Sequence, residues 1–320
     1  TEKKHLTIAM QGGGTHGAFT GGVLDRIFEE KDIVVSGVSG AGTGGMNAVC
    51  VAQGIMNGGN EGAREMLKKY WLKVRKLSSN SGAFDNWFGS DTVKYPRGFV
   101  LFDQLFKTFS PYHLNLPWMY SQREVIRDLF DFDKLNEFDE VKVFLSAIQV
   151  YASKLRVFSS INRDLSENVL AAVTCLPSVF NSVSMDGEYY WVCGNVGNPV
   201  VYPLVYECDA NDVMLIRIGS TYRNRLPFTT MEVLNRVNEI SNNIFVRNEI
   251  HSFLFEKIRF HLIEDEKFFQ NLDWSSKFNS DERFLNYLFN AGRMAADRWL
   301  EKYYDKIGEE TTTSIGESFV

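Results

Sequence analysis

The chain has 320 residues, of which 44% are hydrophobic and 23% are charged, and its formal net charge is −6. This composition excludes a disordered tail and predicts one large α/β domain or two ordinary domains around a substantial core. The acidic balance argues against a protein that holds nucleic acid through phosphate contacts, and only seven prolines exclude a proline-rich linker.

The N-terminal residues predict no export signal, because they lack the apolar stretch and the cleavage site of a signal peptide. No run of eighteen apolar residues predicts a membrane-spanning helix. The four cysteines have neither metal-ligand nor disulfide-framework spacing, so we expect reduced thiols and no bound metal. These features predict a cytoplasmic protein, while secretion without a cleaved signal stays open.

The first sixty residues alternate between short strands and glycine-rich turns. Residues 6–10 and 33–38 are predicted strands, and each runs into a glycine turn that a helix follows, from Ala18 and from Met46. This order is typical of an α/β fold in which both turns lie at the carboxyl ends of strands. Ligands bind at that edge of an open α/β sheet, so we expect the functional site there.

The rest of the chain shows no composition break and no internal repeat, which predicts a single domain over residues 1–306. This domain contains an irregular, aromatic-rich insertion at about 78–120 and a helical C-terminal part at about 229–304. Residues 307–320 are predicted to be a polar tail. The remaining predicted elements are helices at 61–75 and 121–130 and strands at 141–150, 155–159, 188–191 and 213–218.

The first turn is rich in glycine and precedes a helix, so its N–H groups are predicted to bind an anion or to form an oxyanion hole. It lacks the Gly-Lys-Ser/Thr ending of a P-loop, and no acidic residue follows the second strand as a dinucleotide site requires. No cofactor is therefore expected. The alternative is a tight turn that only packs helix against strand, and His16 either orients an anion or points to solvent. The predicted site consists of Gly12, Gly13, Gly14, Thr15, His16 and Gly17.

The second turn has the small flanking residues of a nucleophile elbow, Gly-x-Ser-x-Gly, in which a serine stands between a strand and a helix. In the stretch Gly40-Ala41-Gly42-Thr43-Gly44, however, the central position is Gly42, which has no side chain to attack a substrate. Ser39 lies about three residues earlier than an elbow serine should. It is the fallback nucleophile, and its alternative role is a hydroxyl that hydrogen-bonds the loop backbone.

With these turns and several later segments, the chain resembles the bacterial patatin-like phospholipases. The resemblance covers most of the chain, and ordered matches of this kind are more specific than any single glycine motif. The matching segments are the glycine-rich residues 11–19, the elbow 39–49, the Leu-Pro segment 176–180, the residues 186–191 and 197–199, and the C-terminal segments 274–277 and 292–300.

The resemblance implies a three-layer α/β/α fold with a mainly parallel sheet, and a Ser–Asp dyad that cleaves lipid acyl esters. In the register of the family, the nucleophile position falls on Gly42, because Met46-Asn47-Ala48-Val49 follows it as in the family's elbow. The dyad aspartate, which begins an Asp-Gly-Gly motif, falls on Val192. Asp186 does not substitute for it, because the family commonly has an Asp-Gly turn there as well.

Three functions follow as hypotheses. The first is a patatin-like protein without hydrolase activity that binds an acyl, phospholipid-like or other anionic ligand, or a protein partner in a homo- or hetero-oligomer. The second is an active lipid acyl hydrolase that uses Ser39, or Cys193 with a rearranged partner. The third is a membrane-surface or protein-interaction module, carried by the aromatic residues of the region 84–120. Those aromatic residues have the alternative role of covering the core.

Overall fold

The computed structural model describes residues 3–80, 108–114, 121–177, 179–194, 196–253, 256–272 and 274–313. Most of the predicted insertion and residues 314–320 therefore lie outside the described residues. The two roles expected for the aromatic residues of the region 84–120, an interaction surface or a cover of the core, stay predictions. Within the described ranges, no helix is both long and apolar enough to cross a bilayer.

The described residues form one eight-stranded sheet whose centre is parallel. Its main strand order is β5-β6-β3-β2-β1-β7-β8, and β4 pairs with β3 beside this path. The neighbours β3-β2-β1-β7-β8 all run parallel, while β4 and β6 are antiparallel to β3 and β5 is antiparallel to β6. The strands are β1 (Lys4–Met10), β2 (Ile33–Gly40), β3 (Lys142–Gln149), β4 (Lys154–Ser159), β5 (Val183–Met185), β6 (Glu188–Val192), β7 (Asp212–Ile216) and β8 (Arg259–Ile263).

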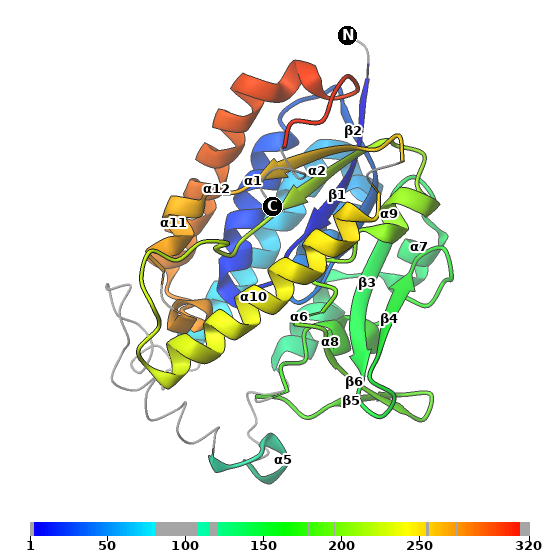
Figure 1. The fold of residues 1–320 in the computed structure, drawn as a ribbon. Helices are drawn as coiled ribbons and strands as arrows, with labels where there is room; N and C mark the ends of the chain where they lie inside the picture. The colour runs from blue at the N-terminus through cyan, green and yellow to red at the C-terminus, as the bar shows by residue number, and fades with distance from the viewer. Residues whose placement is uncertain are drawn as a thin grey trace.

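Helices cover both faces of this sheet (Figure 1), as the alternation of side chains along the central strands requires. In β1, Leu6, Ile8 and Met10 point into one core with α1, α2 and α12, whereas Ala9 points into a second core with α9 and α10. The predicted three-layer α/β/α fold is therefore confirmed. The helices are α1 (Gly17–Ile27), α2 (Thr43–Asn80), α5 (Pro111–Leu114), α6 (Ser121–Leu129), α7 (Phe132–Glu137), α8 (Glu167–Val173), α9 (Tyr202–Glu207), α10 (Thr230–His251), α11 (Glu266–Gln270) and α12 (Glu282–Tyr303).

The C-terminal part differs in two ways from the predicted run of helices and polar tail. A strand, β8, interrupts the helices and extends the sheet beside β7. The beginning of the tail also packs on this strand, because Ile307 is buried and the N–H of Thr312 donates to the carbonyl of Phe260 at 3.0 Å. The prediction missed β8 because it is only five residues long and lies between charged segments.

Candidate functional site

The two glycine turns lie side by side at the carboxyl edge of the sheet. Their strands are parallel neighbours, and the last residue of β1, Met10, pairs with the last residue of β2, Gly40. The turns touch through their backbones, because a Cβ added to Gly12 would lie 2.0 Å from the carbonyl oxygen of Ala41. The expectation that both turns share one edge of the sheet is confirmed.

Gly42 has a left-handed backbone with φ of +56°, between the end of β2 and the start of α2. A Cβ added there would lie 3.6 Å from the Cα of Gly12 and 3.9 Å from the Cγ2 of Val192, which are ordinary contacts. The flanking glycines have no such room, since an added Cβ would lie 2.4 Å from backbone atoms at Gly40 and 2.1 Å at Gly44. The turn therefore has space for a side chain at its centre and at neither flank, as a nucleophile elbow requires.

Val192 is the last residue of β6 and lies next to this central position. Its N–H donates to the carbonyl of Cys175 at 2.9 Å, and the N–H of Gly42 donates to the carbonyl of Val173 at 3.1 Å. The structure thus brings together the two positions that the sequence predicted as nucleophile and base. Neither residue has a side-chain group that can attack a carbonyl carbon or accept a proton.

The first two N–H groups of the first turn, at Gly12 and Gly13, already have acceptors. The N–H of Gly12 donates to the Oδ1 of Asn198 at 2.7 Å, and the Nδ2 of Asn198 donates to the carbonyl of Gly12 at 3.0 Å. The N–H of Gly13 donates to the Oγ1 of Thr43 at 3.3 Å, and this hydroxyl donates to the carbonyl of Gly14 at 2.9 Å. An anion bound by the first two amides would have to displace these side-chain oxygens.

His16 is buried, so the alternative that it points to solvent is wrong. Its Nε2 lies 2.7 Å from the Oγ of Ser276, and the hydroxyl of Thr15 donates to the carbonyl of Ser276 at 2.9 Å. Burial lowers the pKa of His16 well below its usual value, and the charges of Lys277 and Arg223 lower it further. The imidazole is therefore neutral at neutral pH and joins the turn to the 3-10 helix at residues 274–278.

The two fallback nucleophiles are both buried and hydrogen-bonded. Ser39 lies inside β2, and its Oγ donates to the carbonyl of Val200 at 2.6 Å. Ser39 thus has the alternative role expected from the sequence, that of a hydroxyl that hydrogen-bonds the backbone. The Sγ of Cys193 lies 3.1 Å from the carbonyl oxygen of Gly197, and burial raises the pKa of this thiol to about 12.

The sequence did not single out Asn198 or Ser276 as parts of this site. Both residues lie in segments that resemble the family, and this resemblance was the only feature of the sequence that could have indicated them. Each contact joins residues far apart in the chain, so no local motif contains both partners. Asn198 is separated by 186 residues from Gly12, and Ser276 by 260 residues from His16.

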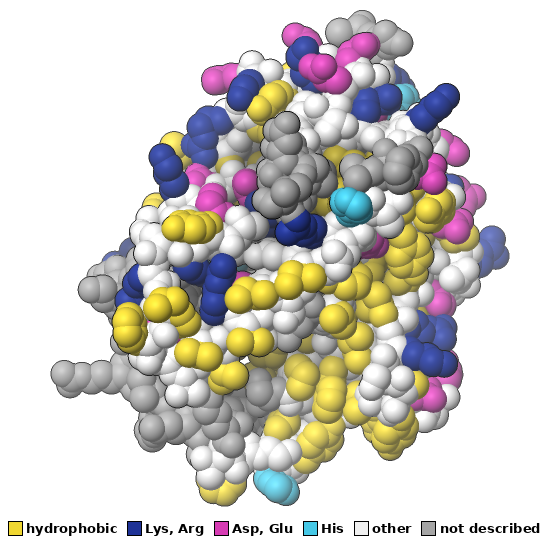
Figure 2. Space-filling view, viewed as in Figure 1, with side chains coloured by type: hydrophobic (Ala, Val, Ile, Leu, Met, Phe, Trp, Pro, Cys, Tyr) yellow, Lys and Arg dark blue, Asp and Glu magenta, His cyan; other side chains and the backbone are white. Residues whose placement is uncertain are grey.

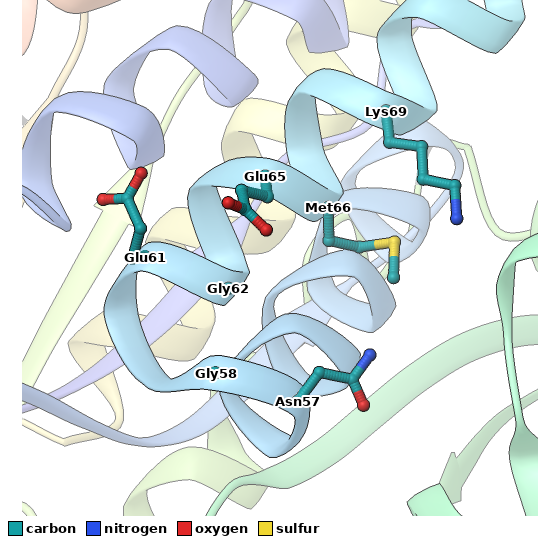
Figure 3. Close-up of a pocket in the computed structure, with 7 residues that line it drawn as sticks. All are labelled: Asn57, Gly58, Glu61, Gly62, Glu65, Met66 and Lys69. Carbon is teal, nitrogen blue, oxygen red and sulfur yellow. The ribbon is translucent and has the colours of Figure 1, made fainter.

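A separate pocket of about 370 Å³ lies where α2 is interrupted at Gly58 and Gly59 (Figure 3). It shares no residue with the two turns, so it is not part of the candidate site. Among the described residues, no group of three His, Cys, Asp or Glu side chains could hold a metal ion. The pocket is lined by Asn57, Gly58, Glu61, Gly62, Glu65, Met66 and Lys69.

Solved structures of two bacterial proteins are similar to this chain. One is VipD from Legionella pneumophila, with a TM-score of 0.39 and 12% identity over 94% of this chain and 67% of VipD. Another is the ExoU–SpcU complex from the type III secretion system of Pseudomonas aeruginosa, with a TM-score of 0.39 and 15% identity over 94% of this chain and 52% of the matched chain. A further structure of ExoU has a TM-score of 0.34 and 11% identity, over 94% of this chain and 53% of ExoU. This chain thus spans about half the length of ExoU.

The comparison with protein families gives a match to one model. No curated protein matches the chain. The model of the patatin-like phospholipase family matches residues 8–200, which include both glycine turns and Val192. Because this match covers more than half of the 320 residues, the chain belongs to the patatin-like phospholipase family.

Proposed function

We propose that this chain has lost the lipid acyl-ester hydrolysis of its family and acts by binding an acyl or anionic ligand or a protein partner. The observation that carries the proposal is that Gly42 and Val192 stand at the two dyad positions of the family and lie close together, since a Cβ added to Gly42 would lie 3.9 Å from the Cγ2 of Val192. Nucleophile and base act as a unit, and their removal from a serine protease leaves catalysis of only about 10³–10⁴ over water. Without both groups, the acyl transfer step has no covalent route.

The geometry of the empty position supports loss of chemistry on an intact scaffold. The left-handed backbone of Gly42 is the conformation that a strained strand-to-helix turn needs, and a Cβ added there would make only ordinary contacts with the described residues. A carboxylate or acyl carbonyl oxygen could enter here if Asn198 or Thr43 gave up its hydrogen bond to an amide of the first turn. The ligand we propose therefore carries a carboxylate or an acyl carbonyl group, as do the acyl esters that the family cleaves.

The alternative, an active hydrolase, meets two obstacles in the described residues. The hydroxyl of Ser39 is fully buried and donates to a backbone carbonyl rather than to a base. The thiol of Cys193 has a pKa raised to about 12, so its thiolate, which is the nucleophilic form, is scarce at neutral pH. Both residues therefore support the backbone instead of an attack on an ester.

The test is ester hydrolysis by the purified chain, measured with a p-nitrophenyl ester and a fluorescent phospholipid. We expect no turnover by the natural sequence and no labelling by a fluorophosphonate probe. The double variant Gly42→Ser/Val192→Asp should gain turnover and labelling, because it restores nucleophile and base. Gly42→Ser/Val192→Asn is the matched control, since asparagine has the shape of aspartate but cannot act as the base.

A different result would overturn the proposal. Turnover by the natural chain that Ser39→Ala or Cys193→Ala abolishes would show that the chain is an active enzyme. Ligand binding is measured separately with a fluorescent fatty acid. Val192→Phe fills the space beside Gly42 and should weaken binding, whereas Val196→Phe, at an exposed position, should leave it unchanged.

A further inference from the structure

The side chain of Thr43 occupies part of the first glycine turn. Its Oγ1 accepts a hydrogen bond from the N–H of Gly13 at 3.3 Å and donates one to the carbonyl of Gly14 at 2.9 Å. An amide N–H at the edge of a sheet otherwise bonds water or a ligand oxygen. The turn whose N–H groups were predicted to bind an anion therefore holds an oxygen that belongs to the chain itself.

The position of Thr43 in the second turn makes this contact possible. Thr43 directly follows Gly42 and is the first residue of α2, so its own N–H cannot bond within that helix. In a nucleophile elbow, the oxyanion hole consists of the N–H of the residue after the nucleophile and an N–H from another loop. In this chain the corresponding donors are the N–H of Thr43 and the N–H groups of the first turn. The residue that supplies one donor therefore covers another with its hydroxyl.

Of the two side chains that occupy the first turn, Thr43 is the easier one to displace. Asn198 is buried and makes two hydrogen bonds with Gly12, at 2.7 and 3.0 Å. Thr43 is half-buried, and its bond from the N–H of Gly13 is longer than the usual range for N–H···O hydrogen bonds. A hydroxyl can also rotate away about a single side-chain bond. The N–H of Gly13 is therefore the donor that a ligand oxygen could take over.

The charges of the protein do not replace these N–H groups as a means of holding a carboxylate. The chain has a net charge of −6, and in Figure 2 the Lys and Arg side chains along the upper and right edges lie among Asp and Glu side chains. Near the first turn, Arg223 is bonded to Glu239 and Lys277 to Asn235. The affinity for a carboxylate therefore depends on the N–H groups of the turns and on what already occupies them.

We propose that the hydroxyl of Thr43 is an internal competitor, which lowers the affinity of the site for ligands with a carboxylate or an acyl carbonyl oxygen. This inference rests on the proposed function, because it concerns the ligand of the same site. The competitor is part of the chain, so its local concentration is constant and every ligand that needs the N–H of Gly13 must displace it. We expect the affinity to be lowered about three- to tenfold, which corresponds to the net contribution of one hydrogen bond.

A purely structural role of Thr43 predicts a different result. Its Oγ1 would lie 2.6 Å from a Cβ added to Gly17, so the side chain also packs against the start of α1. If the hydroxyl only tied the two turns together, its removal would loosen the site and weaken ligands with any headgroup. If it is a competitor, its removal strengthens the binding of a carboxylate in particular, because an ionised oxygen bonds an N–H more strongly than a neutral one.

The test is a titration of the full chain with a fluorescent fatty acid and with the same probe carrying a primary alcohol in place of the carboxylate. Thr43→Ala should bind the fatty acid about three- to tenfold more tightly than the natural chain, and the alcohol with less than about a twofold change. Thr43→Ser keeps the hydroxyl and should bind the fatty acid as weakly as the natural chain does. Thr230→Ala is the matched control, because Thr230 is likewise the first residue of a helix but is exposed and lies outside the two turns.

Circular dichroism and a thermal melt verify that each variant is folded. Equal affinities of the natural chain and Thr43→Ala for the fatty acid, an equal gain for acid and alcohol, or no binding by any variant would overturn the proposal. Failure of the proposed function has a separate readout, which is turnover of an ester by the natural chain. A fatty acid is a product of ester hydrolysis and is not itself cleaved, so the comparison between Thr43→Ala and the natural chain holds in that case as well.

Discussion

Asn198 and Gly12 exchange two hydrogen bonds, at 2.7 and 3.0 Å, between the segment after β6 and the turn after β1. Asn198 thereby satisfies both the N–H and the carbonyl of a residue whose backbone also touches the second turn. The segment that begins with Val192 therefore does two things at once: it approaches Gly42, and it holds the first turn in place.

Asn198→Ala should destabilise the protein by about 1–3 kcal/mol, because two partly buried hydrogen bonds are lost and a buried amide is left without its acceptor. Urea unfolding followed by circular dichroism measures the change. The exposed residue Asn162 serves as the control, and Asn162→Ala should change the free energy of unfolding by less than about 0.5 kcal/mol. Equal stabilities of the two variants would contradict this role of Asn198.

Gly42→Ala should be tolerated far better than Gly12→Ala. A Cβ fits beside Gly42, so the main cost is the left-handed backbone, about 1–2 kcal/mol. At Gly12 the same atom would lie 2.0 Å from the carbonyl oxygen of Ala41, and the two turns would have to separate. We expect folded Gly42→Ala and a loss of more than about 3 kcal/mol, or no soluble protein, for Gly12→Ala. Comparable melting temperatures would show that the turns are not in backbone contact.

Stability should decrease as the pH falls below about 6.5, because His16 is buried with its pKa lowered from the usual 6.5. The unfolded chain binds a proton in this range that the folded chain does not, so acid favours unfolding by up to about 1.4 kcal/mol per pH unit. Urea unfolding between pH 7 and pH 5 measures this slope. His16→Gln should flatten it, while His113→Gln, at an exposed position, should leave it unchanged.

The parts of the fold that repeat a local pattern were predictable from the sequence. The β-branched and glycine-rich segments predicted β1, β2 and the two turns at one edge, and the structure confirms them. The strand β8 was missed, because Arg259 and His261 make it look like exposed chain. In the structure these two side chains bind Asp212 of the neighbouring strand, a contact no local pattern reveals.

The proximity of Gly42 and Val192 was predictable from the motif register, whereas the hydrogen bonds around them were not. The capture of the Gly12 amide by Asn198 depends on how distant segments fold together. The way in which α10 is buried was equally hidden. Its first half buries the carboxylate of Glu239, whereas its second half packs aliphatic side chains into the core.

The negative charge of the Asp212 carboxylate should stabilise the fold, and acid should remove this stabilisation by protonating the carboxylate. Burial alone would raise its pKa, but hydrogen bonds from His261, from Arg259 and from the N–H of Gly308 lower it to about 2, from a usual value of 3.8. Because the folded-state pKa is the lower one, the stabilisation is present above pH 3.8 and is lost as the pH falls toward 2.

Asp212→Asn should therefore lower the free energy of unfolding by about 2 kcal/mol at pH 7 and by much less near pH 2. Guanidinium unfolding at several pH values measures the difference between the two proteins. Asp209→Asn, at an exposed position three residues away, is the matched control and should give a small difference at every pH. A loss for Asp212→Asn that stays constant from pH 7 to pH 2 would trace the stabilisation to packing rather than to the carboxylate charge.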